Sequence, residues 1–146
     1  MTIDLTGRSD AAIYRKRPRL FAVEFAHTTQ TIATLEGPVL CRPGDAIVTG
    51  IVGEQWPVPP DVFPSKYEAV APTRTGESGQ YRSLAQTVRA VQLRAPLEVA
   101  LSAGRGRLLG VAGDWLVQYA PGDCSVVRDA IFRSTYECVP DAGAQG

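Results

Sequence analysis

Two side chains in this sequence have the type and the setting for covalent or acid–base chemistry. Cys124 follows Asp123 in a predicted loop and could act as a nucleophile, although no base stands beside it in the sequence. Glu24 lies in a predicted strand, and a carboxylate held in a cleft has a raised pKa and can act as a general base. Cys124 and Glu24 are therefore the candidate catalytic residues. The alternatives are a buried free thiol and a strand position that faces solvent.

Four side chains are candidates for ligand binding. Trp56 stands in the segment Gly53–Pro57, a predicted polar-aromatic loop whose indole could stack on a planar ligand or cover a small core. Trp115 is the only other tryptophan. Gln92 is matched with Glu24 in an internal repeat, so an amide and a carboxylate would meet if that face lines a cleft. The candidate ligand-binding residues are Trp56, Trp115, Glu24 and Gln92.

The cysteine and histidine content argues against a metal centre. Cys41, Cys124 and Cys138 form no C-x-x-C pair, and His27 is the single histidine. The acidic residues show no D-x-D spacing of the kind that binds a divalent cation. We therefore expect no metal site, no disulfide framework and no cofactor.

The charge balance argues against two classes of partner. Fifteen basic residues balance 15 acidic ones, so no global field attracts nucleic acid or an anionic membrane. No apolar run approaches the ~20 residues of a membrane span, and the N-terminal segment lacks the apolar stretch of a signal peptide. These features favour a cytoplasmic protein.

Arginine supplies nearly all of the positive charge, as is typical of a GC-rich bacterial genome. Lys16 and Lys66 are the only lysines. Two short basic segments, Tyr14–Arg19 and Gly104–Arg107, could bind phosphate. Neither opens a helix after a strand as a phosphate loop does, so we interpret both as solvated edges that protect strands from pairing.

The elements that must position these residues come in an internal repeat. Gly44–Val70 aligns without gaps with Gly113–Val139, and ten of the 27 aligned pairs are identical. With a one-residue slip the alignment extends back to Ala22–Phe25 over Ala90–Leu93, which matches Glu24 with Gln92. Identical pairs serve demands common to both copies and are assigned to turns and core: Gly44/Gly113, Phe63/Phe132 and Tyr67/Tyr136. Positions that differ are freer to serve one site, and these include Trp56, Trp115, Cys124 and the Glu24/Gln92 pair.

Each copy is predicted to consist mostly of strands. Apolar and polar residues alternate over Phe21–Phe25, the period of a half-buried strand. A turn follows at Gly44-Asp45 and at Gly113-Asp114, because glycine tolerates positive φ and the aspartate can accept a backbone N–H. The other predicted strands are Thr31–Leu35, Pro38–Cys41, Ala46–Val48, Glu68–Val70, Val99–Leu101, Arg107–Leu109, Trp115–Val117 and Glu137–Val139. Short helices are predicted over Pro59–Tyr67 and Arg128–Tyr136.

The expected fold class is α+β and mostly β, with two tandem β-rich repeats that each hold one short helix. The boundaries are 14–70 for the first repeat, 71–80 for a polar linker, 81–139 for the second repeat and 140–146 for a disordered tail. A unit of this size buries little apolar surface alone. We therefore expect one compact domain in which the repeats pack with pseudo-twofold symmetry.

Several short motifs, in order, resemble known families. In the first copy Tyr14–Pro18, Ala22–Phe25, Thr34–Gly37, Gly53-Glu54 and Pro60–Phe63 resemble small phage and prophage proteins of unassigned function. In the second copy Gly113–Val117, Pro121–Asp123 and Phe132 to Tyr136-Glu137 are similar to the bacterial PGDYG family. The resemblance covers Tyr14–Val139 and implies phage-type character in two tandem copies. It supplies no activity.

The chain departs from these families at two places. The naming motif reads Pro121-Gly122-Asp123-Cys124-Ser125, so its tyrosine and final glycine are replaced. Phage-type members also carry a longer insert after the first strand, where this chain has only Ala26–Gln30. A partner surface formed by that insert would be missing here.

Two functions compete on these observations. The first is a non-catalytic module of accessory character that binds a small molecule or a protein in the groove between the repeats. The second is a cofactor-independent enzyme of the cyclase or isomerase type from bacterial specialised metabolism, with its site in an inter-repeat cavity. A homodimer is compatible with both, whereas a nucleic-acid or membrane partner is not expected.

Overall fold

The chain folds mainly into short antiparallel strands. The computed structural model describes residues 3–101 and 104–139 and contains fourteen strands and two short helices in these ranges, in agreement with the predicted mostly-β class. None of the helices within the described ranges is long and apolar enough to span a membrane. The predicted tail, 140–146, lies outside the described residues.

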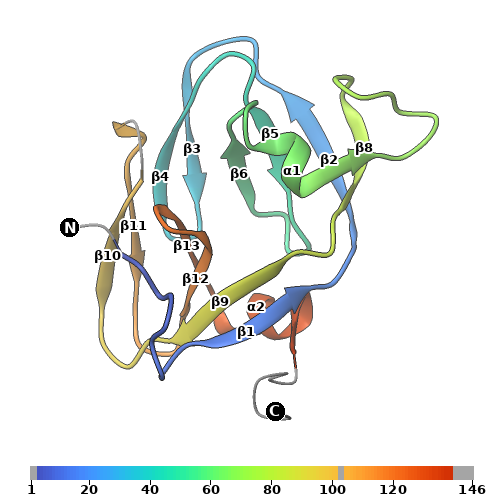
Figure 1. The fold of residues 1–146 in the computed structure, drawn as a ribbon. Helices are drawn as coiled ribbons and strands as arrows, with labels where there is room; N and C mark the ends of the chain where they lie inside the picture. The colour runs from blue at the N-terminus through green and yellow to red at the C-terminus, as the bar shows by residue number, and fades with distance from the viewer. Residues whose placement is uncertain (1–2, 102–103, 140–146) are drawn as a thin grey trace.

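Ten of the strands form two five-stranded sheets (Figure 1). In the first sheet the order is β6 (Gln55–Val58), β5 (Ala46–Thr49), β2 (Leu20–Phe25), β8 (Gly79–Ser83) and β7 (Tyr67–Ala69). In the second sheet the order is β13 (Asp123–Val127), β12 (Trp115–Ala120), β9 (Thr87–Gln92), β1 (Ala12–Lys16) and β14 (Tyr136–Cys138). Each sheet therefore contains one strand from the other half of the chain, β8 in the first and β1 in the second.

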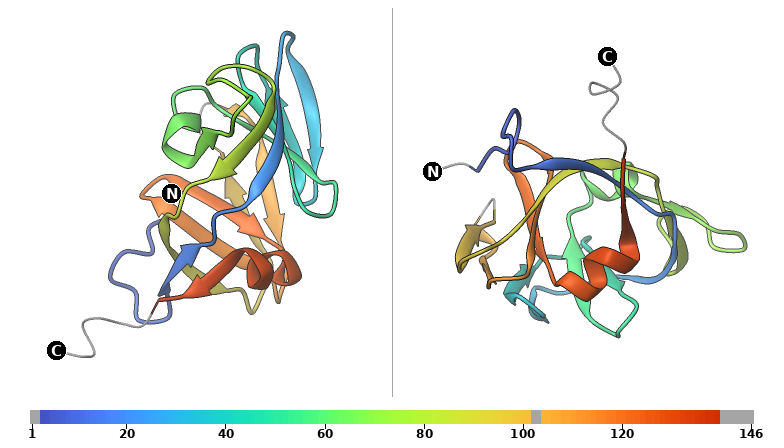
Figure 2. Two further views of the ribbon diagram at one scale, coloured as in Figure 1. Left: turned by 90° about the vertical axis from the view of Figure 1, so that its right-hand side faces the viewer. Right: turned by 90° about the horizontal axis from the view of Figure 1, so that it is seen from below.

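The last residues of β1 and β8 are hydrogen-bonded to the segments that precede β9 and β2. The N–H of Lys16 donates to the carbonyl of Gln86 at 2.8 Å, and the N–H of Ser83 donates to the carbonyl of Arg19 at 2.8 Å. Figure 2 shows β1 passing from the second sheet into β2 of the first. The two halves therefore share strands, and the linker at 71–80 does not divide the chain into two separately folded sheets.

The remaining four strands form two hairpins. The first joins β3 (Gln30–Thr34) to β4 (Gly37–Cys41), and the second joins β10 (Leu97–Ala100) to β11 (Arg107–Gly110). The hairpins meet edge to edge. The N–H of Leu40 donates to the carbonyl of Arg105, and the N–H of Leu109 donates to the carbonyl of Glu36, each at 2.8 Å.

Glycine permits the close approach of these two hairpins. A Cβ on Gly37 would lie 2.8 Å from the carbonyl oxygen of Arg107, and a Cβ on Gly106 would lie 2.7 Å from that of Pro38. Both glycines have positive φ, 142° and 134°. A side chain at either position must push the hairpins apart.

We expect Gly106→Ala to lower the free energy of unfolding by about 1–3 kcal/mol. The matched control is Gly76→Ala, because Gly76 also has positive φ but has nothing within 4 Å of its Cβ position. The free energy of unfolding of Gly76→Ala should fall by only about 1 kcal/mol, the cost of a positive φ at a residue with a Cβ. Urea denaturation of both variants checks the difference, and equal losses would refute the role given to hairpin contact.

The helices are shorter than the sequence predicts. They are α1 (Phe63–Lys66) and α2 (Asp129–Thr135), and Tyr67 and Tyr136 already begin the strands β7 and β14. The first helix begins later than predicted because Pro64 has no N–H to donate to the carbonyl of Pro60, which interrupts the helical hydrogen bonds after Phe63. The identical aromatic pairs, Phe63/Phe132 and Tyr67/Tyr136, are nonetheless core residues, as predicted. Phe63 stacks on Tyr67 with ring centroids 5.1 Å apart, and Phe132 stacks on Tyr136 at 4.8 Å.

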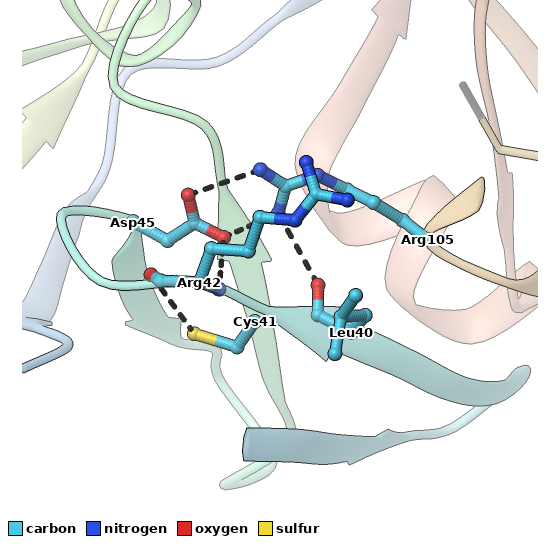
Figure 3. A network of polar contacts seen from close by, with 5 residues as sticks. All are labelled: Leu40, Cys41, Arg42, Asp45 and Arg105. Atoms are coloured by element: carbon cyan, nitrogen blue, oxygen red, sulfur yellow. Dashed lines mark hydrogen bonds and ion pairs between the residues drawn. The ribbon is translucent and has the colours of Figure 1, made fainter. Parts of the chain in front are cut away.

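Three other expectations are corrected. Trp56 lies in the strand β6 and not in a loop, because it pairs with Val48 of β5. The last two residues of the predicted linker, 79 and 80, belong to β8. The basic segments are not fully solvated, since Lys16 is only 5% exposed and the guanidinium of Arg105 binds the buried carboxylate of Asp45 (Figure 3). Arg105 is enclosed from the opposite half of the chain through Asp45, whereas Lys16 is enclosed by Phe21, Tyr67 and Lys66 from its own half.

Candidate functional site

A cavity of about 880 Å³ lies between the two sheets and the joined hairpins. Its walls come from β1, β6 and β7, from the β12–β13 segment, from both helices and from the β10–β11 hairpin. Most of the lining is aliphatic or aromatic, with Phe21, Trp56, Val58, Val99, Leu108 and Val126 among the wall residues. Charged and phenolic groups interrupt this apolar surface, and the environments of the two lysines, of three tyrosines and of Glu36 define the chemistry described here.

Lys16 is the most enclosed cation in the cavity wall. Lys16 is only 5% exposed. Its ammonium lies 5.7 Å from the ring centroid of Phe21 and 5.2 Å from the ring centroid of Tyr67. Burial, together with the positive charge of Lys66, lowers the pKa of Lys16 to about 8. Within the described ranges Lys16 forms no ion pair with a carboxylate.

Lys66, the other lysine of the chain, lies in the same cavity. Its ammonium is 3.4 Å from the carboxylate of Asp123 and 3.7 Å from the ring centroid of Tyr119. The side chain is 13% exposed. Burial lowers the pKa of Lys66, and Asp123 opposes that effect. Lys66 is thus a compensated cation next to an uncompensated one.

Three tyrosines face the lysines. The hydroxyls of Tyr119 and Tyr136 share a hydrogen bond of 2.6 Å. Burial raises the pKa of Tyr119 to about 12 and the pKa values of Tyr67 and Tyr136 above their ordinary value. All three phenols therefore stay protonated at neutral pH. Since one hydroxyl of the Tyr119–Tyr136 pair donates to the other, one O–H hydrogen of the pair remains to donate elsewhere.

A carboxyl group lies at another part of the wall. Burial raises the pKa of Glu36 to about 7, although Arg128, 3.8 Å away, opposes the rise. Glu36 comes from the β3–β4 turn and Arg128 from the residue before α2. The wall therefore holds an acid that titrates near neutrality, but it is not near the lysines in any contact that the structure records.

Two of the residues predicted for the site line this cavity. Trp56 is half-buried and packs edge-on against Phe21, with ring centroids 6.1 Å apart. Cys124 is half-buried, and burial raises the pKa of its thiol, which disfavours the thiolate needed for nucleophilic attack. Its sulfur lies 3.9 Å from the carbonyl of Ile3 and 4.0 Å from Oε1 of Gln118, and neither group is a strong base.

The strand registers shift the predicted alignment of the two halves near Glu24. In the first sheet the repeated valine Val48 lies opposite Val23. In the second sheet its counterpart Val117 lies opposite Ala90. Glu24 therefore corresponds to Val91, one residue before Gln92, which was the predicted match. Sequence alone could not place this slip, since period-two patterns fit a strand equally well in other registers.

Glu24, Gln92 and Trp115 do not line the cavity. Glu24 is exposed on the first sheet, whereas Gln92 lies in the second sheet, where its amide donates to the carbonyl of Gly113 at 3.0 Å. Trp115 is buried and donates its indole N–H to Asp129 at 2.8 Å. The expected meeting of a carboxylate and an amide does not occur, because the two strands belong to different sheets.

Sequence reasoning missed Lys16, Lys66 and the tyrosine pair. One signal was present: the chain has only two lysines among its fifteen basic residues, and both line the cavity. Lys66 also aligns with Thr135 in the ungapped repeat, so it is a position where the copies differ. Within the described ranges no group of three or more His, Cys, Asp or Glu side chains could hold a metal.

The residues that resemble the naming motif are part of this site. Pro121 and Gly122 make the turn between β12 and β13, and Asp123 pairs with Lys66. The PGDYG protein family matches residues 37–137, more than half of the chain and parts of both halves. The chain belongs to the PGDYG protein family. In this member the motif continues as Cys124-Ser125 within β13, so its last position is an extended strand residue.

Neither a curated protein nor a solved structure matches the chain.

Proposed function

We propose that this protein binds a small organic molecule in the cavity between its two sheets. The supporting observation is the cavity itself. Its volume of about 880 Å³ falls within the range typical of ligand pockets, and its mainly apolar wall also holds charged and phenolic groups that can orient a ligand. A concave site of this kind suits a small molecule better than a protein surface, which would need an exposed patch.

We also infer that the chain is a tandem duplication with pseudo-twofold symmetry. The order of elements supports this, because the two sheets have the same order when each strand of the first half is matched with the strand seven places later. Paired hydrogen bonds also support it. The contact of Leu40 with Arg105 becomes that of Leu109 with Glu36 when the halves are exchanged. The cavity then lies between the repeats, as the proposed groove requires.

The phage-type, accessory character of the protein and its bacterial, cytoplasmic origin are part of the same proposal. Their support comes from the motifs of the first copy, the arginine-rich composition and the three free thiols, Cys41, Cys124 and Cys138. The balanced charge supports the absence of a nucleic-acid partner.

The neutral fluorescent probe N-phenyl-1-naphthylamine tests the proposed function. We expect it to bind at one site per chain with enhanced fluorescence, because an apolar cavity excludes water from the probe. Ser125 lines the cavity at the position that matches Trp56, so the indole of Ser125→Trp should occupy part of the cavity and weaken binding by about 10-fold or more. Fluorescence titration checks both results.

The matched control adds the same side chain outside the cavity. Ser9 is exposed and does not line the cavity, so Ser9→Trp should bind the probe as the unchanged protein does. Melting temperatures of both variants confirm that they fold. If the probe fails to bind the folded protein, or binds Ser125→Trp with full affinity, the cavity is not the ligand site.

A second candidate, a cofactor-independent enzyme of the cyclase or isomerase type, has one observation in its favour. The pKa of Lys16 lies near 8, so part of the population carries a neutral amine at physiological pH. Such an amine in an apolar cavity can act as a nucleophile or a base. Metabolite extracts incubated with the protein distinguish the candidates: turnover that is lost in Lys16→Met favours the enzyme, and binding without turnover favours the binding protein.

A further inference from the structure

We propose that the ligand of this cavity is an organic anion, and that the ammonium of Lys16 binds its charged group. This inference rests on the proposed function and adds the class of ligand. The ligand has an apolar body, which contacts the aromatic and aliphatic wall, and one singly charged oxyanion such as a carboxylate.

The strongest support is the missing partner of Lys16. Buried charges in proteins are paired, since an isolated ammonium loses its hydration without compensation. Arg105 follows this rule through Asp45, and Lys66 follows it through Asp123. Lys16 is buried and points at an open cavity, yet its described neighbours are the rings of Phe21 and Tyr67 and the like-charged Lys66. An anion in the cavity supplies the charge that the chain does not.

The fold does not need a lysine at this position. Under the correspondence of the two halves, the backbone contacts of Lys16 are made by Ser83 in the other sheet. The position of Lys66 is occupied by Thr135 in the same way. The same backbone arrangement therefore forms around small hydroxyl side chains. The fold accepts serine and threonine at these two positions. The two lysines are therefore explained by the binding site that they line and not by the fold.

The neighbouring groups are also suited to an anion. The Tyr119–Tyr136 pair has one O–H hydrogen that is not used within the pair, and both phenols keep their protons well above neutral pH. Of the two lysines, Lys66 is already paired with Asp123, so Lys16 is the one ammonium here that lacks a carboxylate partner. That count favours a carboxylate over a phosphate dianion.

The test compares two probes with the same aromatic frame. N-phenyl-1-naphthylamine is neutral, and 8-anilinonaphthalene-1-sulfonate adds one sulfonate to it. We expect the sulfonate probe to bind more tightly and to be displaced by the neutral one. Lys16→Met should weaken the sulfonate probe by about 10-fold to 100-fold and leave the neutral probe within about twofold.

The matched control removes the same charge from the neighbouring residue. Arg15 is half-exposed on β1 and pairs with Glu137 at 3.0 Å, outside the cavity. Arg15→Met should leave both affinities unchanged. A comparable loss of sulfonate binding in this variant would mean that the overall charge of the protein attracts the probe, and the role of Lys16 would be refuted.

The pH dependence of probe binding to the unchanged protein gives a further test, which needs no variant. Sulfonate affinity should fall as the pH rises through about 8, where free Lys16 loses its proton, while neutral-probe affinity stays constant. The titratable groups that face Lys16 are Lys66 on α1, Tyr67 on β7 and Tyr136 on β14. Both tyrosines stay neutral through this range because their pKa values are raised.

The two proposals fail in different ways. If both probes bind with equal affinity and Lys16→Met changes neither, the cavity binds ligands but the anion inference is wrong. If neither probe binds the folded protein, the proposed function itself is wrong.

Discussion

Replacing Asp45 by alanine should lower the free energy of unfolding by about 3–5 kcal/mol, the typical cost of leaving one member of a buried ion pair alone. Asp45 is 1% exposed and binds the guanidinium of Arg105 through both carboxylate oxygens (Figure 3). It also accepts the N–H of Arg42 at 3.0 Å, so the turn that precedes β5 loses a hydrogen bond as well. Urea denaturation measures the loss.

The other half of the chain contains a matched control. Asp114 accepts the N–H of Val111 at 3.0 Å in the equivalent turn, but it is only half-buried and forms no ion pair within the described ranges. Asp114→Ala should therefore cost about 1 kcal/mol, the net value of one hydrogen bond. Adding Arg105→Met to Asp45→Ala should recover part of the loss, because no unpaired charge then remains. Equal costs for the two aspartates would contradict this assignment.

This pair also links the halves of the chain. Asp45 lies between β4 and β5, and Arg105 precedes β11, where it also donates to the carbonyl of Leu40 at 3.2 Å. The ion pair thus connects the β10–β11 hairpin to the turn between β4 and β5. A loss of this contact should loosen the hairpins that enclose the cavity.

Lys16 should make the stability of the ligand-free protein rise between about pH 8 and pH 10.5. The pKa of Lys16 is about 8 in the folded protein and near 10.5 in an exposed lysine, so the unfolded chain binds more protons in this interval. Stability therefore increases with pH, by about 3 kcal/mol if the full difference in pKa is expressed. Lys16→Met should remove most of the slope and raise stability at pH 7.

Other groups define the useful interval. The lowered pKa of Lys66 gives a slope of the same sign, so a smaller rise should persist in Lys16→Met. The raised pKa values of Tyr67, Tyr119 and Tyr136 act in the opposite sense, because above about pH 10 the unfolded tyrosines lose protons that the folded ones keep. Burial also raises the pKa of the Cys41 and Cys124 thiols, which gives a further slope of that opposite sign. The contribution of Lys16 is therefore the difference in slope between the unchanged protein and Lys16→Met, measured by urea titration from pH 7 to about 9.5. An unchanged slope in Lys16→Met would show that the ammonium is hydrated.

The two buried cations should have opposite effects on stability. Arg105 is paired with Asp45 and holds the hairpins, so its loss weakens the fold. Lys16 has no carboxylate partner in the described chain and should weaken the fold when present. Lys16 should lower the stability of the fold, although Ser83 occupies the equivalent position in the other half of the chain. The presence of a lysine there is best explained by binding of a ligand.

The sequence determined the local elements and the family. Alternation over Phe21–Phe25 predicts β2, and the two Gly-Asp turns precede β5 and β12 where expected. The predicted core aromatics are buried, and the similarity to the PGDYG family is confirmed by the match over residues 37–137. These features depend on neighbouring residues and short spacings, which a single sequence contains in full.

Only the tertiary structure decided the strand neighbours and the site. Period two shows which face of a strand is buried, but it does not show that β1 pairs with β9 and β14, far along the chain. The same limit explains why Glu24 and Gln92 were matched one residue out of register. Lys16 in a basic segment predicts a solvated edge, and its burial follows from the exchange of β1 between the sheets. Burial of a charge depends on which distant elements enclose it.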